Sequence, residues 1–268
     1  MSGRGARGTA PGDEVRITVL GAMPEVAPGD DIALMLTEVA VAGGLQPGDV
    51  LAVAHKVVSK AEGRVVRLAD VRPGPQAHDL AEATGKDAAL CQVILDESRA
   101  VVRRRRSLVV CETHHGLICA NAGVDASNTA EGTVVLLPDD PDASARRIQH
   151  ALSRAAGGRV GVVITDTHGR AFRRGLVNVA VGVAGFEPVL DHRGGRDREG
   201  RMLVATDQAL ADEIAAAAGM LIGKASGRPA ALVRGVCTAP APGRLDDLVR
   251  RRDQDVFRSS ADAHGVVI

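Results

Sequence analysis

The chain has 268 residues, and its 33 Lys and Arg residues balance 33 Asp and Glu residues, so the formal net charge is zero. A balanced charge argues against a dedicated nucleic-acid-binding domain and against a polybasic membrane anchor, because both need an excess of Lys and Arg. Hydrophobic residues make up 45% of the chain, which excludes global disorder and supplies a core.

Aromatic residues are almost absent, since the chain has no Trp, no Tyr and three Phe. A base-stacking platform built on aromatic side chains is therefore excluded. The four cysteines form no CxxC pair, no apolar run approaches the ~20 residues of a membrane span, and no leader is recognisable. These features predict a soluble, cytoplasmic protein with reduced thiols.

The first half of the chain contains short segments whose apolar residues recur with the period of a strand or of a helix. A strand is expected over 15–20, and a helix over 32–41 that Asp30 or Asp31 caps and Gly43-Gly44 ends. We expect a β-hairpin with arms at 49–58 and 65–68. The remaining expected elements of this half are helices over 77–84 and 88–95.

The second half contains more strands than helices. A hairpin is expected at 108–120, and the most continuous β run is 159–165, which looks fully buried and ends at Asp166. The other expected elements are strands over 133–137, 176–183 and 230–236, a helix that Asp142 caps and that runs through Ala155, and helices over 206–222 and near 245–251. Adjacent strand pairs with helices between them predict an α+β fold with mixed or largely antiparallel sheets and flanking helices.

The composition divides the chain into three parts. Residues 1–14 are small and polar and are expected to form a flexible tail. Residues 15–240 should form the functional unit, which could comprise two subdomains, and residues 241–268 a C-terminal extension.

Several common ligand-binding motifs are incomplete or absent in this sequence. The segment Gly219–Ala225 lacks the spacing and the hydroxyl of a phosphate-binding loop, and no GxGxxG follows a strand. Cys111, His114, His115 and Cys119 do not have zinc-site spacing, so core cysteines and turn histidines are the better interpretation. The run Arg103–Arg106 is favoured as a solvated surface over a site that attracts an anion.

Asp125 and Asp166 are the more informative residues. Each follows an apolar strand in a segment with glycine nearby, where carboxylates often gather into sites. Together with the Thr167 hydroxyl they offer the oxygen ligands that Mg²⁺ or Mn²⁺ shares with phosphate. Taken alone, a role as caps and turn formers would still be the simpler explanation.

Three longer strings resemble a known family. They are Val58–Arg64 (VSKAEGR), Asn121–Asn128 (NAGVDASN) and Ile164–Gly175 (ITDTHGRAFRRG). In this order and register they resemble the coenzyme F420-0:L-glutamate ligases, and the similarity runs over roughly residues 15–237.

The resemblance implies a GTP-dependent γ-glutamyl ligase. Members phosphorylate the terminal carboxylate of a phospholactyl-deazaflavin, and the amine of L-glutamate then displaces the phosphate. The resemblance also implies two divalent ions (Mg²⁺ or Mn²⁺), an optional K⁺, a fold of the family's own and an intertwined homodimer. Some members carry a C-terminal nitroreductase-like domain, and this chain is expected to be the ligase part without it.

The family's functional residues fall on definite positions of this chain. Its metal ligands fall on Asp125, Asp166 and Thr167, and Asp125, Asp166 and Lys60 are expected to serve catalysis. Its guanine-nucleotide contacts fall on Met23, Pro24, Glu25, Val26, His55, Lys56, Lys60, Asn128, Ile222, Gly223, Lys224, Ala225, Ser226, Gly227, Arg228 and Pro229.

Two positions depart from the expected pattern. His55 stands where a Ser or Gln is expected, and Lys224 stands where some members carry an acidic metal ligand. Lys224 would contact phosphate, or the second metal would lose a protein ligand. From charge alone, Arg170, Arg173 and Arg174 are candidates for holding the substrate phosphate or the glutamate carboxylates.

Two alternative functions remain open at this point. The same ligase chemistry could act on another carboxylate acceptor. A non-catalytic anion- or RNA-binding protein could use the arginine runs at 103–106 and 250–252, although zero net charge and the missing aromatics argue against it.

Overall fold

The computed structural model describes residues 14–223, 227–236, 238–255 and 257. Its centre is a five-stranded sheet in the order β1-β12-β2-β8-β9. The strands are β1 (Arg16–Val19), β2 (Val50–Ala54), β8 (Gly161–Arg170), β9 (Arg173–Ala184) and β12 (Ala230–Arg234). Only β2 and β8 pair in parallel within this sheet, so the predicted α+β class with a mixed, largely antiparallel sheet is confirmed.

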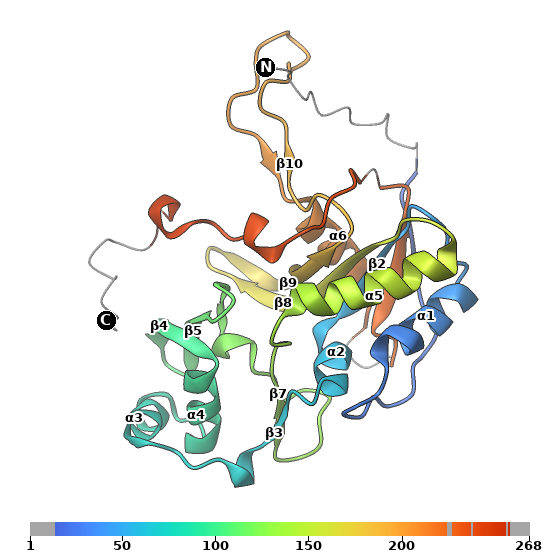
Figure 1. Ribbon diagram of the computed structural model, residues 1–268. Helices are drawn as coiled ribbons and strands as arrows, with labels where there is room; N and C mark the ends of the chain where they lie inside the picture. The colour runs from blue at the N-terminus through green and yellow to red at the C-terminus, as the bar shows by residue number, and fades with distance from the viewer. Residues whose placement is uncertain (1–13, 224–226, 237, 256, 258–268) are drawn as a thin grey trace.

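Helices cover both faces of this sheet (Figure 1). α1 (Ile32–Ala42) and α5 (Pro141–Ala156) pack on one face, where their apolar residues meet Val162 and Ile164 of β8. α6 (Leu210–Gly219) packs on the other face against Val163. Successive side chains of a strand point to opposite faces, so an unbroken apolar run such as that of β8 is what a strand covered on both sides requires.

A second group of elements forms its own apolar cluster beside the main sheet (Figure 1). It includes two helices, α3 (Pro75–Thr84) and α4 (Ala88–Asp96), and a three-stranded sheet. The strands of that sheet are β4 (Ser98–Arg105), β5 (Leu108–Thr113) and β6 (Ile118–Ala120). A short ladder of β3 (Val65–Arg67) and β7 (Thr133–Val135) connects this group to the main sheet.

Besides α6 and β12, the chain beyond β9 forms an arm and a C-terminal segment. The arm is the pair β10 (Leu190–Asp191) and β11 (Asp207–Gln208), which projects from the body in Figure 1. The C-terminal segment contains two 3₁₀ turns, Leu245–Asp247 and Arg252–Gln254. In the described part of the chain, no helix has the length and apolar character needed to cross a bilayer.

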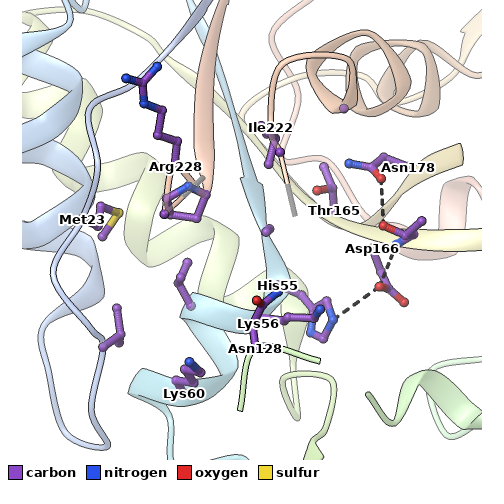
Figure 2. Close-up of a pocket in the computed structure, with 18 of the residues that line it drawn as sticks. Met23, His55, Lys56, Lys60, Asn128, Thr165, Asp166, Asn178, Ile222 and Arg228 are labelled. Carbon is purple, nitrogen blue, oxygen red and sulfur yellow. Dashed lines mark hydrogen bonds and ion pairs between the residues drawn. The ribbon is translucent and has the colours of Figure 1, made fainter. Parts of the chain in front are cut away.

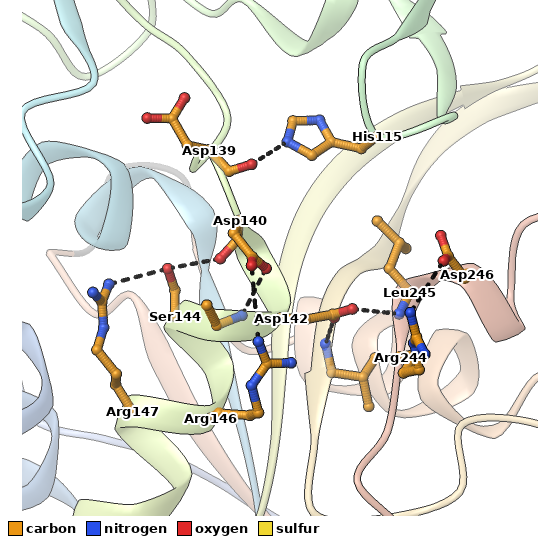
Figure 3. Close-up of polar contacts among 12 residues, drawn as sticks. His115, Asp139, Asp140, Asp142, Ser144, Arg146, Arg147, Arg244, Leu245 and Asp246 are labelled. Atoms are coloured by element: carbon orange, nitrogen blue, oxygen red, sulfur yellow. Dashed lines mark hydrogen bonds and ion pairs between the residues drawn. The ribbon is translucent and has the colours of Figure 1, made fainter.

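The carboxylate of Asp142 connects three parts of the structure. It lies in the first turn of α5 and accepts hydrogen bonds from the backbone amides of Val183 in β9 and Leu245, both at 2.9 Å (Figure 3). Burial raises the pKa of this carboxyl, although the two amide hydrogen bonds oppose that rise. Our prediction that Asp142 caps α5 is therefore wrong: Asp140 is the cap, and it accepts from the Ala143 amide at 2.8 Å.

The expected hairpin over 49–68 is also wrong. The strand stops at Ala54, and α2 (His55–Ala61) follows at once. Val58 and Ala61 are buried on one face of this helix, a spacing of three residues that the strand interpretation overlooked. The returning strand β3 pairs with β7, far along the chain.

Other differences are shifts of boundaries. β8 continues to Arg170, so Asp166 lies inside a strand rather than after one, because β9 pairs with it along the whole hairpin. The predicted helix over 206–222 is shorter, since β11 occupies its start. The arginine run at 103–105 lies in β4, a strand we did not predict, and its side chains are exposed.

Cys111 and Cys119 are buried opposite each other in β5 and β6, with His114 and His115 in the turn between the two strands. The predicted hairpin and the interpretation of core cysteines with turn histidines are confirmed.

An ion pair with a buried carboxylate, where β2 begins and β12 ends, should contribute measurably to stability. Asp49 is 1% exposed and binds Arg234 through two contacts of 2.7 Å. We expect Asp49→Asn to lower the free energy of unfolding by about 2 kcal/mol, because hydrogen bonds to charged groups contribute ~1.5–3 kcal/mol. Urea denaturation measures this. The matched control is Glu14→Gln, which removes an exposed ion pair with Arg16 and should change little; equal losses in both variants would contradict the assignment.

Candidate active site

A cavity of about 840 Å³ opens where β2 ends and its parallel pairing with β8 stops. Its wall includes the start of α2, the loop at 23–26, the segment around 227–229 that leads into β12, and the end of α6. The carboxyl ends of neighbouring parallel strands commonly carry ligand sites, and here Ala54 of β2 lies opposite Thr165 of β8.

Most of the residues predicted from the sequence line this cavity. They are Met23, Pro24, Glu25, Val26, His55, Lys56, Lys60, Asn128, Asp166, Thr167, Ile222, Gly223, Gly227, Arg228 and Pro229. Lys224, Ala225 and Ser226 lie outside the described residues.

Asp166 lies between two imidazoles, and Figure 2 shows the one that belongs to His55. One carboxylate oxygen is 3.4 Å from His55 Nε2, and the other is 3.3 Å from His168 Nε2. Burial alone would raise the pKa of Asp166, but the contacts with His168 and His55 outweigh it and hold this pKa well below its usual range. The carboxylate therefore stays ionised at neutral pH although its side chain is only 13% exposed.

Asp125 is held by the residue next to His55. Its carboxylate lies 2.7 Å from Lys56 Nζ and also accepts from the Ser127 amide at 2.7 Å. Burial favours the neutral acid, yet Lys56 and Ser127 lower the pKa of Asp125 overall. Asp125 itself does not line the cavity wall, whereas Lys56 does.

The first two residues of α2 thus each contact one of the two aspartates. His55 faces Asp166 of the main sheet, and Lys56 faces Asp125, which bridges to Val135 of β7. The sequence strings that contain the two aspartates are far apart in the chain, and α2 brings them to one place.

A second lysine of α2 contacts the loop on the opposite wall. Lys60 Nζ is 2.5 Å from the carboxylate of Glu25. Glu25 is largely exposed, while the Lys60 side chain is mostly buried. The ammonium groups of Lys56 and Lys60, together with the Arg228 side chain, give the cavity a cationic wall that suits an anionic ligand.

Sequence reasoning missed Asn178, which lies opposite Thr167 in the β8–β9 ladder. Thr167 Oγ1 donates to Asn178 Oδ1 at 3.0 Å, so the lone pairs of this hydroxyl remain available to a cation (Figure 2). Gly219 leaves room for the Asn178 amide, because a Cβ at that position would lie 2.9 Å from Asn178 Cγ. Only a prediction that residue 167 pairs with residue 178 in the β8–β9 ladder could have pointed to Asn178.

The donor set fits a hard divalent cation that shares its ligands with a substrate. Asp166 and Asp125 supply carboxylate oxygens and Thr167 a hydroxyl, which are oxygen ligands of the kind Mg²⁺ and Mn²⁺ prefer. No cluster of three or more His, Cys, Asp or Glu side chains arranged for a metal occurs among the residues described.

The three arginines predicted to hold substrate lie elsewhere, at the outer end of the β8–β9 hairpin. Arg170 donates to the backbone oxygens of Arg174 and Gly175, and Arg173 and Arg174 are exposed. None of the three lines the cavity. Their role in binding a substrate stays a prediction.

A family model and several relatives of known name all indicate the same enzyme family. Residues 21–235 match the family model described as F420-0:Gamma-glutamyl ligase. The chain is 46% identical to the coenzyme F420:L-glutamate ligase of Methanothermobacter thermautotrophicus, over 88% of this chain and 96% of that protein. It is 45% identical to the enzyme of the same name from Methanopyrus kandleri, over 87% of this chain and 94% of that protein. It is also 40% identical to the coenzyme F420:L-glutamate ligase of Methanocaldococcus jannaschii, over 84% of this chain and 90% of that protein.

The lowered pKa of Asp166 predicts how an Asp166→Asn variant responds to pH. Ionised Asp166 contributes stability above the ~3.9 of an unfolded aspartate, and the contribution is lost as the pH falls toward the lower folded value. Urea denaturation should therefore show the gap in unfolding free energy between wild type and the variant shrinking as the pH falls from roughly 5 to roughly 3 and below. A gap that stays constant over this range would contradict the assignment.

Proposed function

Because the chain belongs to the F420-0:gamma-glutamyl ligase family, we propose that it uses GTP to join L-glutamate to the terminal carboxylate of the deazaflavin coenzyme F420-0. The products are a γ-glutamyl amide, GDP and phosphate. The relatives' names support a ligase that acts on coenzyme F420. The proposal adds to this that the reaction depends on GTP and passes through an acyl phosphate.

The chemistry explains why a nucleotide is needed. A carboxylate is a poor electrophile, and forming an amide from it in water is unfavourable. Transfer of the γ-phosphoryl group of GTP to the carboxylate makes an acyl phosphate, which is a mixed anhydride, and GDP leaves. The amine of glutamate then attacks the acyl carbon, phosphate leaves with the C–O bond electrons, and the amine loses a proton.

The cationic wall would hold the phosphate chain. Lys60 and Lys56 point from α2 into the cavity, and their ammonium groups would neutralise charge on the transferring phosphoryl group. Lys56 now contacts Asp125 at 2.7 Å, so binding of the nucleotide would move this ammonium group from the carboxylate toward phosphate.

Asp125, Asp166 and Thr167 would hold one or two Mg²⁺ or Mn²⁺ ions. When bound, such ions neutralise phosphate charge and orient the transferring group. The protein's own part is to keep Asp166 ionised through His55 and His168 and to keep the Thr167 proton turned toward Asn178. A binding role for K⁺ and a homodimeric assembly also belong to this proposal.

One observation carries the proposal above the others. Two ionised aspartates are held by consecutive residues at the start of α2, beside a cavity that two lysines and an arginine line. Carboxylates beside an anion-binding wall are what a cation-assisted phosphoryl transfer needs. A nucleic-acid-binding protein would have no use for such a buried arrangement.

The proposal predicts the behaviour of an Asp166→Asn variant in a complete reaction. Mass spectrometry after incubation of the wild-type protein with GTP, Mn²⁺, L-glutamate and the unglutamylated coenzyme should show a product heavier by one or more glutamyl residues. Asp166→Asn should lower the rate by more than roughly 100-fold, because removal of a direct ligand should exceed the 10–100-fold loss that is typical of residues behind the ligands.

The matched control is Asp79→Asn, an exposed aspartate of α3 away from the cavity, which should leave the rate unchanged. A wild-type protein that forms no product with this acceptor but cleaves GTP with another carboxylate would favour a different acceptor. Full activity of Asp166→Asn at saturating Mn²⁺ would refute the assignment of the metal ligands.

A further inference from the structure

Several buried side-chain nitrogen and oxygen atoms at or next to Asp166 form no hydrogen bond of good geometry with the described residues. Three of them are Thr165 Oγ1, His55 Nε2 and His168 Nε2. The two imidazole nitrogens face the Asp166 carboxylate at 3.4 and 3.3 Å. Within the described part of the chain, Thr165 Oγ1 has no hydrogen-bond partner, although the residue is only 1% exposed.

Backbone pairing places Thr165 at the inner end of the cavity. It pairs with Ala54, the last residue of β2 before α2 begins, and it lines the cavity with its neighbour Asp166. The ladder with β9 has an irregularity between Ile164 and Thr165. Such bulges re-aim side chains and occur often beside active sites.

The hydroxyl of Thr165 brings the folded protein no stabilising hydrogen bond. Burying an unpaired hydroxyl costs desolvation free energy that a valine of the same shape would avoid. A buried polar group left unpaired in this way calls for an explanation, and a ligand that completes its hydrogen bonding is one.

We propose that Thr165 Oγ1 donates a hydrogen bond to a phosphate oxygen of the nucleotide bound in this cavity. This inference rests on the proposed function. Lys56, Lys60 and Arg228 line the same cavity and select an anionic ligand, and an anionic oxygen is the strongest acceptor for a hydroxyl.

The position within the cavity favours the phosphate chain over the base. Figure 2 shows Thr165 on the side of Asp166 and Asn178, whereas Met23 lies on the opposite side of the cavity. The carboxylate end of the cavity is where a phosphate–cation complex would lie, so the hydroxyl of Thr165 would meet phosphate there.

The test compares Thr165→Val, which keeps the shape, with Thr165→Ser, which keeps the hydroxyl. Isothermal titration in the presence of Mg²⁺ measures the affinity for a non-hydrolysable GTP analogue and for guanosine. We expect Thr165→Val to weaken binding of the GTP analogue by about 10-fold or more, the scale of a lost hydrogen bond to a charged group. Affinity for guanosine should not change, and Thr165→Ser should bind the GTP analogue like wild type.

Thermal unfolding of the ligand-free proteins separates this binding role from a structural one. Thr165→Val should melt at the same temperature as wild type or higher, because it removes an unpaired buried hydroxyl. A melting temperature several degrees lower would mean that the hydroxyl stabilises the fold, and it would overturn the proposal.

A second measurement tests whether the Thr165 hydroxyl binds the cation rather than phosphate. Electron paramagnetic resonance measures the affinity for Mn²⁺ in the absence of nucleotide. Unchanged Mn²⁺ affinity in Thr165→Val supports the proposal, and a clear loss overturns it. If wild type binds the GTP analogue and Thr165→Val binds it equally well, this inference alone fails. If wild type binds no GTP analogue, the proposed function fails and the inference fails with it.

Discussion

The buried carboxylate of Asp166 is the constraint on which the site depends. An ionised carboxylate that is largely removed from water is stable only when polar partners replace its hydration. His55 and His168 are those partners, one at each oxygen. His168 comes from the same strand, but His55 begins α2, so the contact with His55 joins the start of this helix to β8.

The position of α2 then organises the rest of the cavity. With His55 against Asp166, the next residue, Lys56, meets Asp125, and Lys60 meets Glu25 on the facing loop. Each of these contacts joins α2 to a segment distant in the sequence. The same lysines are the groups that would bind phosphate, so the ion pairs seen here are contacts that a nucleotide would replace. The helix therefore serves both the fold and the binding of an anion.

Much of the architecture could be predicted from residue patterns, whereas most of the cavity wall was predicted only through the resemblance to a known family. Asp31 caps α1 and Gly157 ends α5, and these local signals act within a few residues. The role of Asp142 could not be predicted, because its partners Val183 and Leu245 are brought near only by tertiary packing. The segment after Ala54 was misread as a strand, because its valines suit a strand as well as a helix. Asn178 and Thr165 were missed for a similar reason: their significance depends on strand register and on an unpaired buried hydroxyl.

In the proposed function, Asp125 and Asp166 hold divalent cations against the phosphate chain of a guanine nucleotide. The most direct measurement is a crystal structure of the protein with GDP and Mn²⁺, in which anomalous scattering locates manganese. The account predicts manganese bound to oxygens of Asp166 and Asp125, with GDP in the adjoining cavity and Lys56 Nζ moved away from Asp125. Bound GDP without manganese at these carboxylates, or manganese at a different place in the fold, would contradict it.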